Sequence, residues 1–131
     1  MTNSPTPLEY LPHLPRDKTV GIGCIGAGFI MADCHLVAYR QAGFHPVAIA
    51  SRTLARAAEV AKRHHIKNVY DDYKKLLDDP RVEVVDIAVP PDVQKSVVAD
   101  VVQHKNIRGV LAQKPLGVDY SEACEIVQMC R

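Results

Sequence analysis

The sequence has no tryptophan, and only two phenylalanines and five tyrosines among its 131 residues. Ligand binding therefore cannot be followed through tryptophan fluorescence. The formal net charge of +1 provides no general attraction for nucleic acid or for an anionic membrane surface. No apolar run approaches the roughly 20 residues that span a bilayer. We therefore expect neither nucleic acid nor a membrane as a partner. An anion would have to be bound by a local group of residues.

Cysteine is also scarce, and its spacing excludes the usual frameworks. No C-x-x-C pair occurs among the four cysteines, Cys24, Cys34, Cys124 and Cys130. The N-terminus lacks the basic-then-apolar order of a signal peptide. We expect reduced, mostly buried thiols in a cytoplasmic protein. The adjacent pair His64 and His65 would point about 100° apart on a helix, so we expect no metal site.

What is present is typical of one soluble globular domain, with 47% hydrophobic and 24% charged residues. Residues 1–18 contain four prolines and no hydrophobic period, which predicts an extended or disordered N-terminal arm. Packing of this arm on a partner subunit is an open alternative. The remaining residues, 19–131, are expected to form the folded domain.

From residue 19 onward, short β-branched runs alternate with amphipathic stretches. Strands are predicted at residues 20–25, 45–50, 68–70, 82–89 and 108–112. Helices are predicted at residues 29–41, 53–65, 72–78, 92–105 and from Asp119, where Glu122 completes a capping box. Apolar strands alternating with helices indicate a parallel sheet covered on both faces. With right-handed crossovers, the fold class is α/β, a doubly wound parallel sheet of about five strands.

Residues 20–31, VGIGCIGAGFIM, contain the G-x-G-x-x-G pattern in two overlapping frames. This pattern binds the pyrophosphate of a dinucleotide only where a strand ends and a helix begins. The literal match begins at Gly21, too early for a completed strand. The frame that begins at Gly26 follows the strand, although it ends in Met31 instead of a small residue. We therefore expect Gly26 to form the tight turn and Gly28 to let the backbone approach phosphate.

Met31 lies at a position that serves helix–strand packing, and we expect a slight displacement of the helix to accommodate it. A glycine-rich turn without a ligand is the alternative. Because the turn falls at the first strand–helix junction, nucleotide binding is favoured over that alternative.

The end of the second predicted strand bears on which dinucleotide is bound. An NAD-selective domain has Asp or Glu there to accept bonds from the ribose hydroxyls. This chain has Ser51 and Arg52 instead, with Arg56 one turn later. A hydroxyl and a guanidinium can bind the 2′-phosphate of NADP. We therefore expect NADP as cofactor, with NAD or dual use left open, and with solvated arginines beside a simple helix cap as the alternative.

Three stretches in this order, GIGCIGAGFIMADCHLVAYRQAG, VVDIAVPPDV and GVLAQKPLGVDYSEA, resemble the Gfo/Idh/MocA oxidoreductase family. The resemblance covers about residues 19–131. It implies a Rossmann domain and NAD(P)-dependent hydride transfer to or from a sugar, inositol or related polyol. It also implies a sixth strand and a C-terminal substrate domain, which we expect to lie beyond residue 131 in a longer protein. We therefore expect residues 19–131 to be the cofactor-binding half of a longer enzyme, inactive alone, with assembly into homo-oligomers left open.

The resemblance also implies roles for individual residues. Gly26, Gly28, Phe29 and Ile30 match the pyrophosphate turn, and Ser51 and Arg52 match the adenosine-ribose position. The dinucleotide would be lined by Ala88, Val89, Pro90 and Pro91. Gln113-Lys114-Pro115 matches the family's Glu-Lys-Pro, in which the lysine lies beside nicotinamide and substrate. Lys114 is therefore the expected catalytic residue, which polarises the reacting hydroxyl, and Gln113 is expected at the cofactor.

Two residues depart from the family pattern. Gln113 replaces the usual glutamate, which removes a carboxylate that could pair with Lys114. Gln94 stands where many relatives have histidine, so one substrate-side contact is in doubt. A stand-alone nucleotide-binding or interaction module with no catalytic activity is the second hypothesis, and a domain that binds no nucleotide is the third.

Overall fold

The computed structural model describes residues 10–131 and contains one sheet of five parallel strands in the order β3-β2-β1-β4-β5. The strands are β1 (Ile22–Ile25), β2 (Ala48–Ala50), β3 (Asn68–Tyr70), β4 (Val84–Ile87) and β5 (Gly109–Ala112). The chain builds outward from β1 through β2 to β3, then returns to place β4 on the other side of β1. This order confirms the predicted doubly wound α/β fold.

Each predicted strand exists, but most are shorter than predicted. The run at 82–89 contains only β4, because Val82 belongs to a turn in which its N–H donates to the Asp79 carbonyl at 3.0 Å. At the other end, Ala88 donates to the Ile25 carbonyl and Val89 leaves the sheet. Apolar character thus continues past the strand ends into turns and into the cleft described below.

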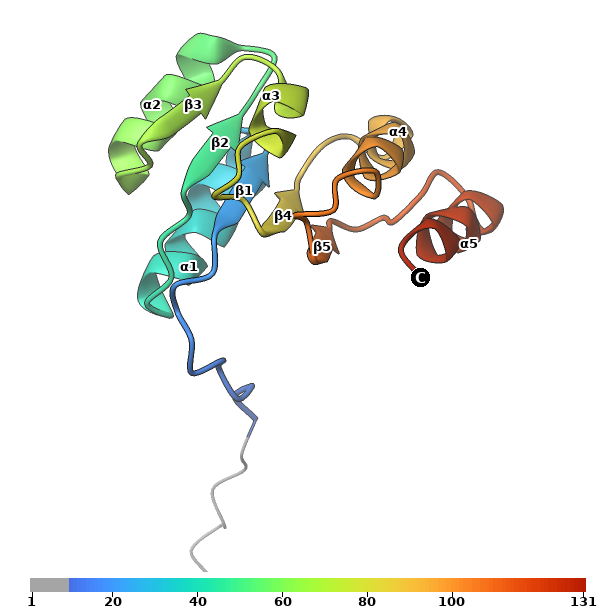
Figure 1. Ribbon diagram of the computed structural model, residues 1–131, viewed down its shortest axis with the longest axis horizontal. Helices are drawn as coiled ribbons and strands as arrows, with labels where there is room; N and C mark the ends of the chain where they lie inside the picture. The colour runs from blue at the N-terminus through green and yellow to red at the C-terminus, as the bar shows by residue number, and fades with distance from the viewer. Residues whose placement is uncertain (1–9) are drawn as a thin grey trace, which may run out of the picture.

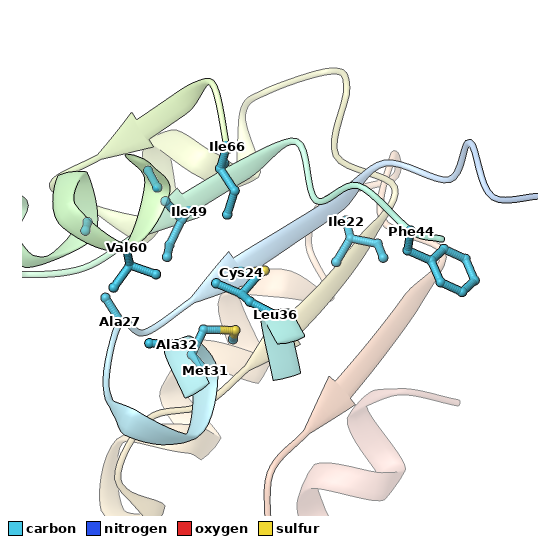
Figure 2. Close-up of a cluster of buried hydrophobic side chains, with 12 residues drawn as sticks. Ile22, Cys24, Ala27, Met31, Ala32, Leu36, Phe44, Ile49, Val60 and Ile66 are labelled. Carbon is cyan, nitrogen blue, oxygen red and sulfur yellow. The ribbon is translucent and has the colours of Figure 1, made fainter. Parts of the chain in front are cut away.

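Helices cover both faces of the sheet (Figure 1). They are α2 (Leu54–His64), α3 (Tyr73–Leu77), α4 (Pro91–Val101), α5 (Tyr120–Met129) and a first helix in two parts, η1 (Ile30–His35) and α1 (Leu36–Gln41). One buried cluster joins the first helix and α2 to one face through Cys24, Met31, Leu36, Ile49 and Val60 (Figure 2). A second cluster joins α3, α4 and α5 to the opposite face through Leu76, Val85, Val98, Val101 and Ile126.

The first helix begins as a wide π-helical segment, with the Leu36 N–H donating to the carbonyl of Met31. Met31 is fully buried beside Cys24 and Leu36, in the space between this segment and the sheet (Figure 2). A π-helical turn inserts an extra residue and locally widens the helix. The structure thus fits Met31 into the core at a local change of helix geometry, where the sequence predicted a slight displacement.

The helix cap predicted at Asp119 is half formed. The Asp119 carboxylate accepts from the Glu122 N–H at 2.8 Å, as a capping box requires. Glu122 does not return the bond to Asp119; its carboxylate accepts instead from the N–H of Val118 at 2.7 Å. Both bonds fix the start of α5 against the preceding loop.

The structure also tests the predictions made for the N-terminal arm and for the cysteines. Residues 1–9 of the predicted arm lie outside the described residues, and residues 10–18 contain no helix or strand and are largely exposed. The expectation of mostly buried thiols is wrong, because Cys24 alone is buried while Cys34 and Cys130 are exposed. Within residues 10–131, no helix is long and apolar enough to cross a membrane, and no cluster of three metal-ligating side chains occurs.

Candidate functional site

The carboxyl ends of β1, β2 and β4 open into a cleft of about 680 Å³. The strand order reverses between β1 and β4, and ligands of doubly wound folds bind at such a switch point. Of the residues predicted to bind cofactor, eight line this cleft: Gly26, Gly28, Ser51, Arg52, Arg56, Ala88, Val89 and Pro90. The fold therefore gathers these residues from three separate strand ends and the start of α2.

The glycine turn after β1 has the geometry expected of the frame that begins at Gly26. Gly26 has a φ of +103°, and its N–H donates to the Ala50 carbonyl at 2.9 Å. A β-carbon on Gly28 would have no heavy atom within 4 Å. The backbone N–H groups of Ala27, Gly28 and Phe29 donate to no other residue in the described part of the chain. An anionic group fits here, because these N–H groups lie at a helix start without an acceptor and the space beside Gly28 is open.

At the far side of the cleft, Ser51 and Arg52 follow β2, and Arg56 lies in the first turn of α2. The Ser51 hydroxyl oxygen accepts from the Thr53 N–H at 3.3 Å, which leaves its own proton free to donate. Neither Arg52 nor Arg56 forms an ion pair within residues 10–131. Two unpaired guanidinium groups therefore face this end of the cleft.

Two carboxylates also border the cleft, and both have partners. Asp71 pairs with Lys75 at 2.7 Å, and the hydrogen bond from that ammonium lowers the pKa of Asp71. Asp72 caps α3 by accepting from the Lys74 N–H at 2.9 Å. Their charge is thus already engaged, and the arginines are available to an incoming anion.

The other residues predicted at the site lie outside the lining of this cleft. Phe29 is 70% exposed at the first-helix start, Ile30 begins η1, and Pro91 is the first residue of α4. Gln113 and Lys114 lie on the loop after β5, where Lys114 is exposed and the Lys114–Pro115 peptide is cis. This loop follows the carboxyl end of the strand next to β4, so it belongs to the same edge of the sheet.

A buried carboxylate near this loop was not anticipated from the sequence. Asp86 of β4 is fully buried, and its Oδ2 accepts from the Tyr39 hydroxyl at 2.7 Å and lies 2.8 Å from His35 Nδ1. Burial, together with the Asp86 carboxylate, raises the pKa of the Tyr39 phenol. The same two causes raise the pKa of the Cys24 thiol. An aspartate inside an apolar strand, facing a helix with His and Tyr four residues apart, is the signal that could have revealed it.

Gln94, whose predicted substrate-side contact was in doubt, has a different place. It is fully buried on α4, and its Nε2 lies 2.8 Å from the Gln113 carbonyl and 2.7 Å from the Leu116 carbonyl. It also approaches the Pro115 carbonyl at 3.2 Å. Gln94 therefore holds the loop that carries Lys114.

Parallel strands in this order, with an open glycine turn at the switch point, define a Rossmann-type dinucleotide-binding domain. The chain belongs to the Gfo/Idh/MocA family, described as an oxidoreductase family with an NAD-binding Rossmann fold, whose model matches residues 20–131.

Among relatives, trans-1,2-dihydrobenzene-1,2-diol dehydrogenase from Bos taurus is 35% identical over 111 residues. That match covers 83% of this chain and 32% of the relative, so the chain spans about a third of the length of the curated relatives it matches.

Two solved structures extend the comparison. Levoglucosan dehydrogenase in complex with NADH and L-sorbose has a TM-score of 0.75 and 27% identity, over 85% of this chain and 31% of that one. KijD10, a 3-ketoreductase from Actinomadura kijaniata in complex with NADP, has a TM-score of 0.77 and 26% identity, over 86% of this chain and 34% of that one. Both NAD and NADP thus occur among the neighbours of this chain.

Proposed function

We propose that residues 19–131 bind NADP(H) in the cleft and form the cofactor-binding half of an oxidoreductase acting on a sugar, inositol or related polyol. The observation that carries the proposal is the turn at Gly28, which has open space beside it and N–H groups without an acceptor in the described part of the chain, at the switch point. Relatives named as diol and sugar dehydrogenases support the substrate class.

The turn after β1 would hold the pyrophosphate. Backbone N–H groups from Ala27 to Phe29 would donate to its oxygens, and the absence of a side chain on Gly28 would allow close approach. Ala88 and Val89 would form the apolar wall beneath the rest of the dinucleotide. When bound, the nicotinamide supplies or accepts the hydride.

The preference for NADP rests on the arginine end of the cleft. A 2′-phosphate carries about two negative charges, which a carboxylate at this position would repel and a guanidinium would bind through two parallel hydrogen bonds. Ser51 donates through its hydroxyl, while Arg52 and Arg56 supply positive charge without breaking an existing ion pair.

Lys114 is proposed as the group that acts on the reacting hydroxyl. An ammonium at the carboxyl end of the sheet would stabilise the negative charge on the substrate oxygen, which arises as the hydroxyl gives up its proton for hydride to leave the carbon, or as a carbonyl accepts hydride in the reverse direction.

The test is calorimetric titration of the 131-residue protein with NADPH and with NADH. We expect both to bind, with NADPH tighter. Arg52→Ala should weaken NADPH by about 10-fold to 100-fold, the value of one charge-assisted hydrogen bond, and leave NADH unchanged. Arg40→Ala, an exposed arginine outside the cleft, is the matched control. Equal weakening of both nucleotides by Arg52→Ala would refute the phosphate role.

Gly28→Val tests the turn itself, since its side chain would occupy the space proposed for phosphate. It should abolish binding of both nucleotides, whereas Ala58→Val, at an exposed position on α2, should not. No heat of binding with either nucleotide would overturn the proposal. Binding without any polyol or sugar oxidation by the longer protein would favour a nucleotide-binding module that does no chemistry.

A further inference from the structure

A continuous line of hydrogen bonds connects the buried core to the backbone of Lys114. It begins at Asp86, whose Oδ2 lies 2.8 Å from His35 Nδ1. The other ring nitrogen, His35 Nε2, lies 2.8 Å from Gln113 Nε2. The Gln113 side-chain oxygen in turn accepts from the Lys114 N–H at 2.8 Å. The line therefore crosses from β4, through the first helix, to the loop after β5.

The elements place these groups by simple geometry. Val85 and Ile87 belong to the cluster on the opposite face, so Asp86 between them points toward the face covered by the first helix. His35 and Tyr39 are four residues apart on that helix and share one of its faces. Both side chains reach the same oxygen of Asp86.

Donor and acceptor counting then selects one arrangement of protons. The Asp86 carboxylate accepts, so His35 Nδ1 carries the ring proton and Nε2 is left as an acceptor. The amide NH₂ of Gln113 supplies the proton that Nε2 needs, which leaves the Gln113 oxygen for the Lys114 N–H. A flipped Gln113 amide would turn its NH₂ toward the Lys114 N–H, donor against donor, and would leave both without a partner.

Burial of the Asp86 carboxylate favours this arrangement of hydrogen bonds. Its other oxygen, Oδ1, is buried and has no hydrogen-bond partner among the described residues. A buried carboxylate is costly unless it is hydrogen-bonded, so the two donors on Oδ2 are those that make its burial tolerable. Moving the ring of His35 would remove one of these two bonds.

We propose that His35 is a positioning residue for Lys114: fixed by Asp86 as the Nδ1-protonated neutral ring, it orients Gln113, and Gln113 holds the Lys114 backbone. This inference rests on the proposed function of Lys114 at the reacting hydroxyl. His35 is not proposed to contact substrate or cofactor itself. Gln94 grips the same loop from α4 through its carbonyls, so the Lys114 segment is held from two sides.

The first measurement needs no variant. Nitrogen-15 NMR of the imidazole groups in the 131-residue protein, without nucleotide, should show His35 with a protonated Nδ1 and an unprotonated Nε2 at mildly alkaline pH. A His35 ring with its proton on Nε2 would overturn the proposal, because that nitrogen could not accept from Gln113.

The second measurement is hydrogen exchange of the Lys114 backbone amide. His35→Phe keeps a ring of similar size but loses both bonds, and Gln113→Met loses the acceptor for Lys114. Each should speed this exchange about tenfold, the value of one hydrogen bond. Tyr39→Phe is the matched control. It removes a hydrogen bond to the same Asp86 oxygen, but Tyr39 does not connect Asp86 to Lys114, so exchange of the Lys114 amide should not change.

Exchange of the Val85 amide in β4 reports on whether each variant remains folded. Unchanged Lys114 exchange in folded His35→Phe would assign His35 a space-filling role and would overturn the inference. Gln113→Glu should restore only part of the protection lost in Gln113→Met, because its carboxylate accepts from the Lys114 N–H but has no proton to donate to His35 Nε2. Since no nucleotide is present, a failure of NADPH to bind would refute the proposed function without changing this result.

Discussion

The carbonyl oxygen of Ala88, just beyond β4, occupies the place where a β-carbon on Gly26 would overlap it. Gly26 also has a φ of +103°, a backbone conformation that side chains disfavour. Gly28, two residues later, has open space on its side-chain face. The two glycines of the turn therefore serve different purposes, Gly26 for the fold and Gly28 for the proposed ligand.

Alanine substitutions should separate these purposes. Gly26→Ala should lower the free energy of unfolding by about 3 kcal/mol, because left-handed strain of about 1–2 kcal/mol adds to the cost of the overlap. Gly28→Ala should change it by less than about 1 kcal/mol. Urea unfolding followed by circular dichroism measures both. Similar losses for the two variants would show that Gly28 is also required for folding.

The choice between the two glycine frames was predictable from the sequence because it depends on strand length. A strand must end before the turn, and only the frame that begins at Gly26 leaves room for β1 (Ile22–Ile25). The alternation of apolar runs and amphipathic stretches likewise predicted all five strands and the order of the helices. These features are local, so single-sequence patterns carry them.

What the sequence did not predict depends on contacts between distant segments. In the line from Asp86 to Gln113, the His35 ring contacts Asp86, 51 positions away in the sequence, and Gln113, 78 positions away. Asp86 looked like one polar residue in an apolar strand. Gln94 in place of the family's histidine only put one substrate-side contact in doubt, and the packing of α4 beside the loop after β5 turns Gln94 toward backbone carbonyls of that loop.

His64 predicts a loss of stability in mild acid. Burial lowers the pKa of His64, with further lowering by the nearby Arg63 and Arg40. The unfolded chain, with an ordinary pKa near 6.5, therefore binds a proton that the folded protein resists. Stability from this group is complete above about pH 6.5 and falls as the pH drops below it, by at most about 1.4 kcal/mol per pH unit.

Urea unfolding at pH 7.5 and at pH 5.5 measures this effect. His64→Leu should flatten the dependence between the two conditions. His65→Asn, at the exposed neighbour with a φ of 60°, should keep it, since asparagine tolerates that conformation. An identical pH dependence in the wild type and in His64→Leu would mean that another group is responsible.

Asp79 should stabilise the fold at neutral pH and lose that effect only in strong acid. Hydrogen bonds from the Arg81 side chain are the main cause that lowers the pKa of Asp79 to about 2, and Tyr70 adds a hydroxyl bond at 2.9 Å. The lowered value stabilises the folded state by about 2 kcal/mol above the ordinary pKa near 3.9. This contribution disappears as the pH falls through about 2.

Asp79→Asn should therefore destabilise the protein by about 2 kcal/mol at pH 7 and by much less near pH 2. Asp78→Asn, an exposed neighbour, should change stability by less than about 0.5 kcal/mol at either pH. Urea unfolding at both pH values gives the comparison. A destabilisation by Asp79→Asn that is equal at the two pH values would point to lost packing and not to the ionised carboxylate.

Lys114 gives a kinetic prediction for the longer oxidoreductase proposed to contain this chain. Lys114→Ala should lower kcat by about 10²-fold to 10³-fold, because the ammonium acts on charge that develops only in the transition state. Its exposed side chain lies outside the lining of the cleft, so the Kd for NADPH should change by less than about twofold. Lys105→Ala, an exposed lysine after α4, should change neither quantity. If Lys114→Ala weakened NADPH as much as it slowed turnover, the lysine would hold the cofactor or the loop, and the hydroxyl would have to be polarised by another group.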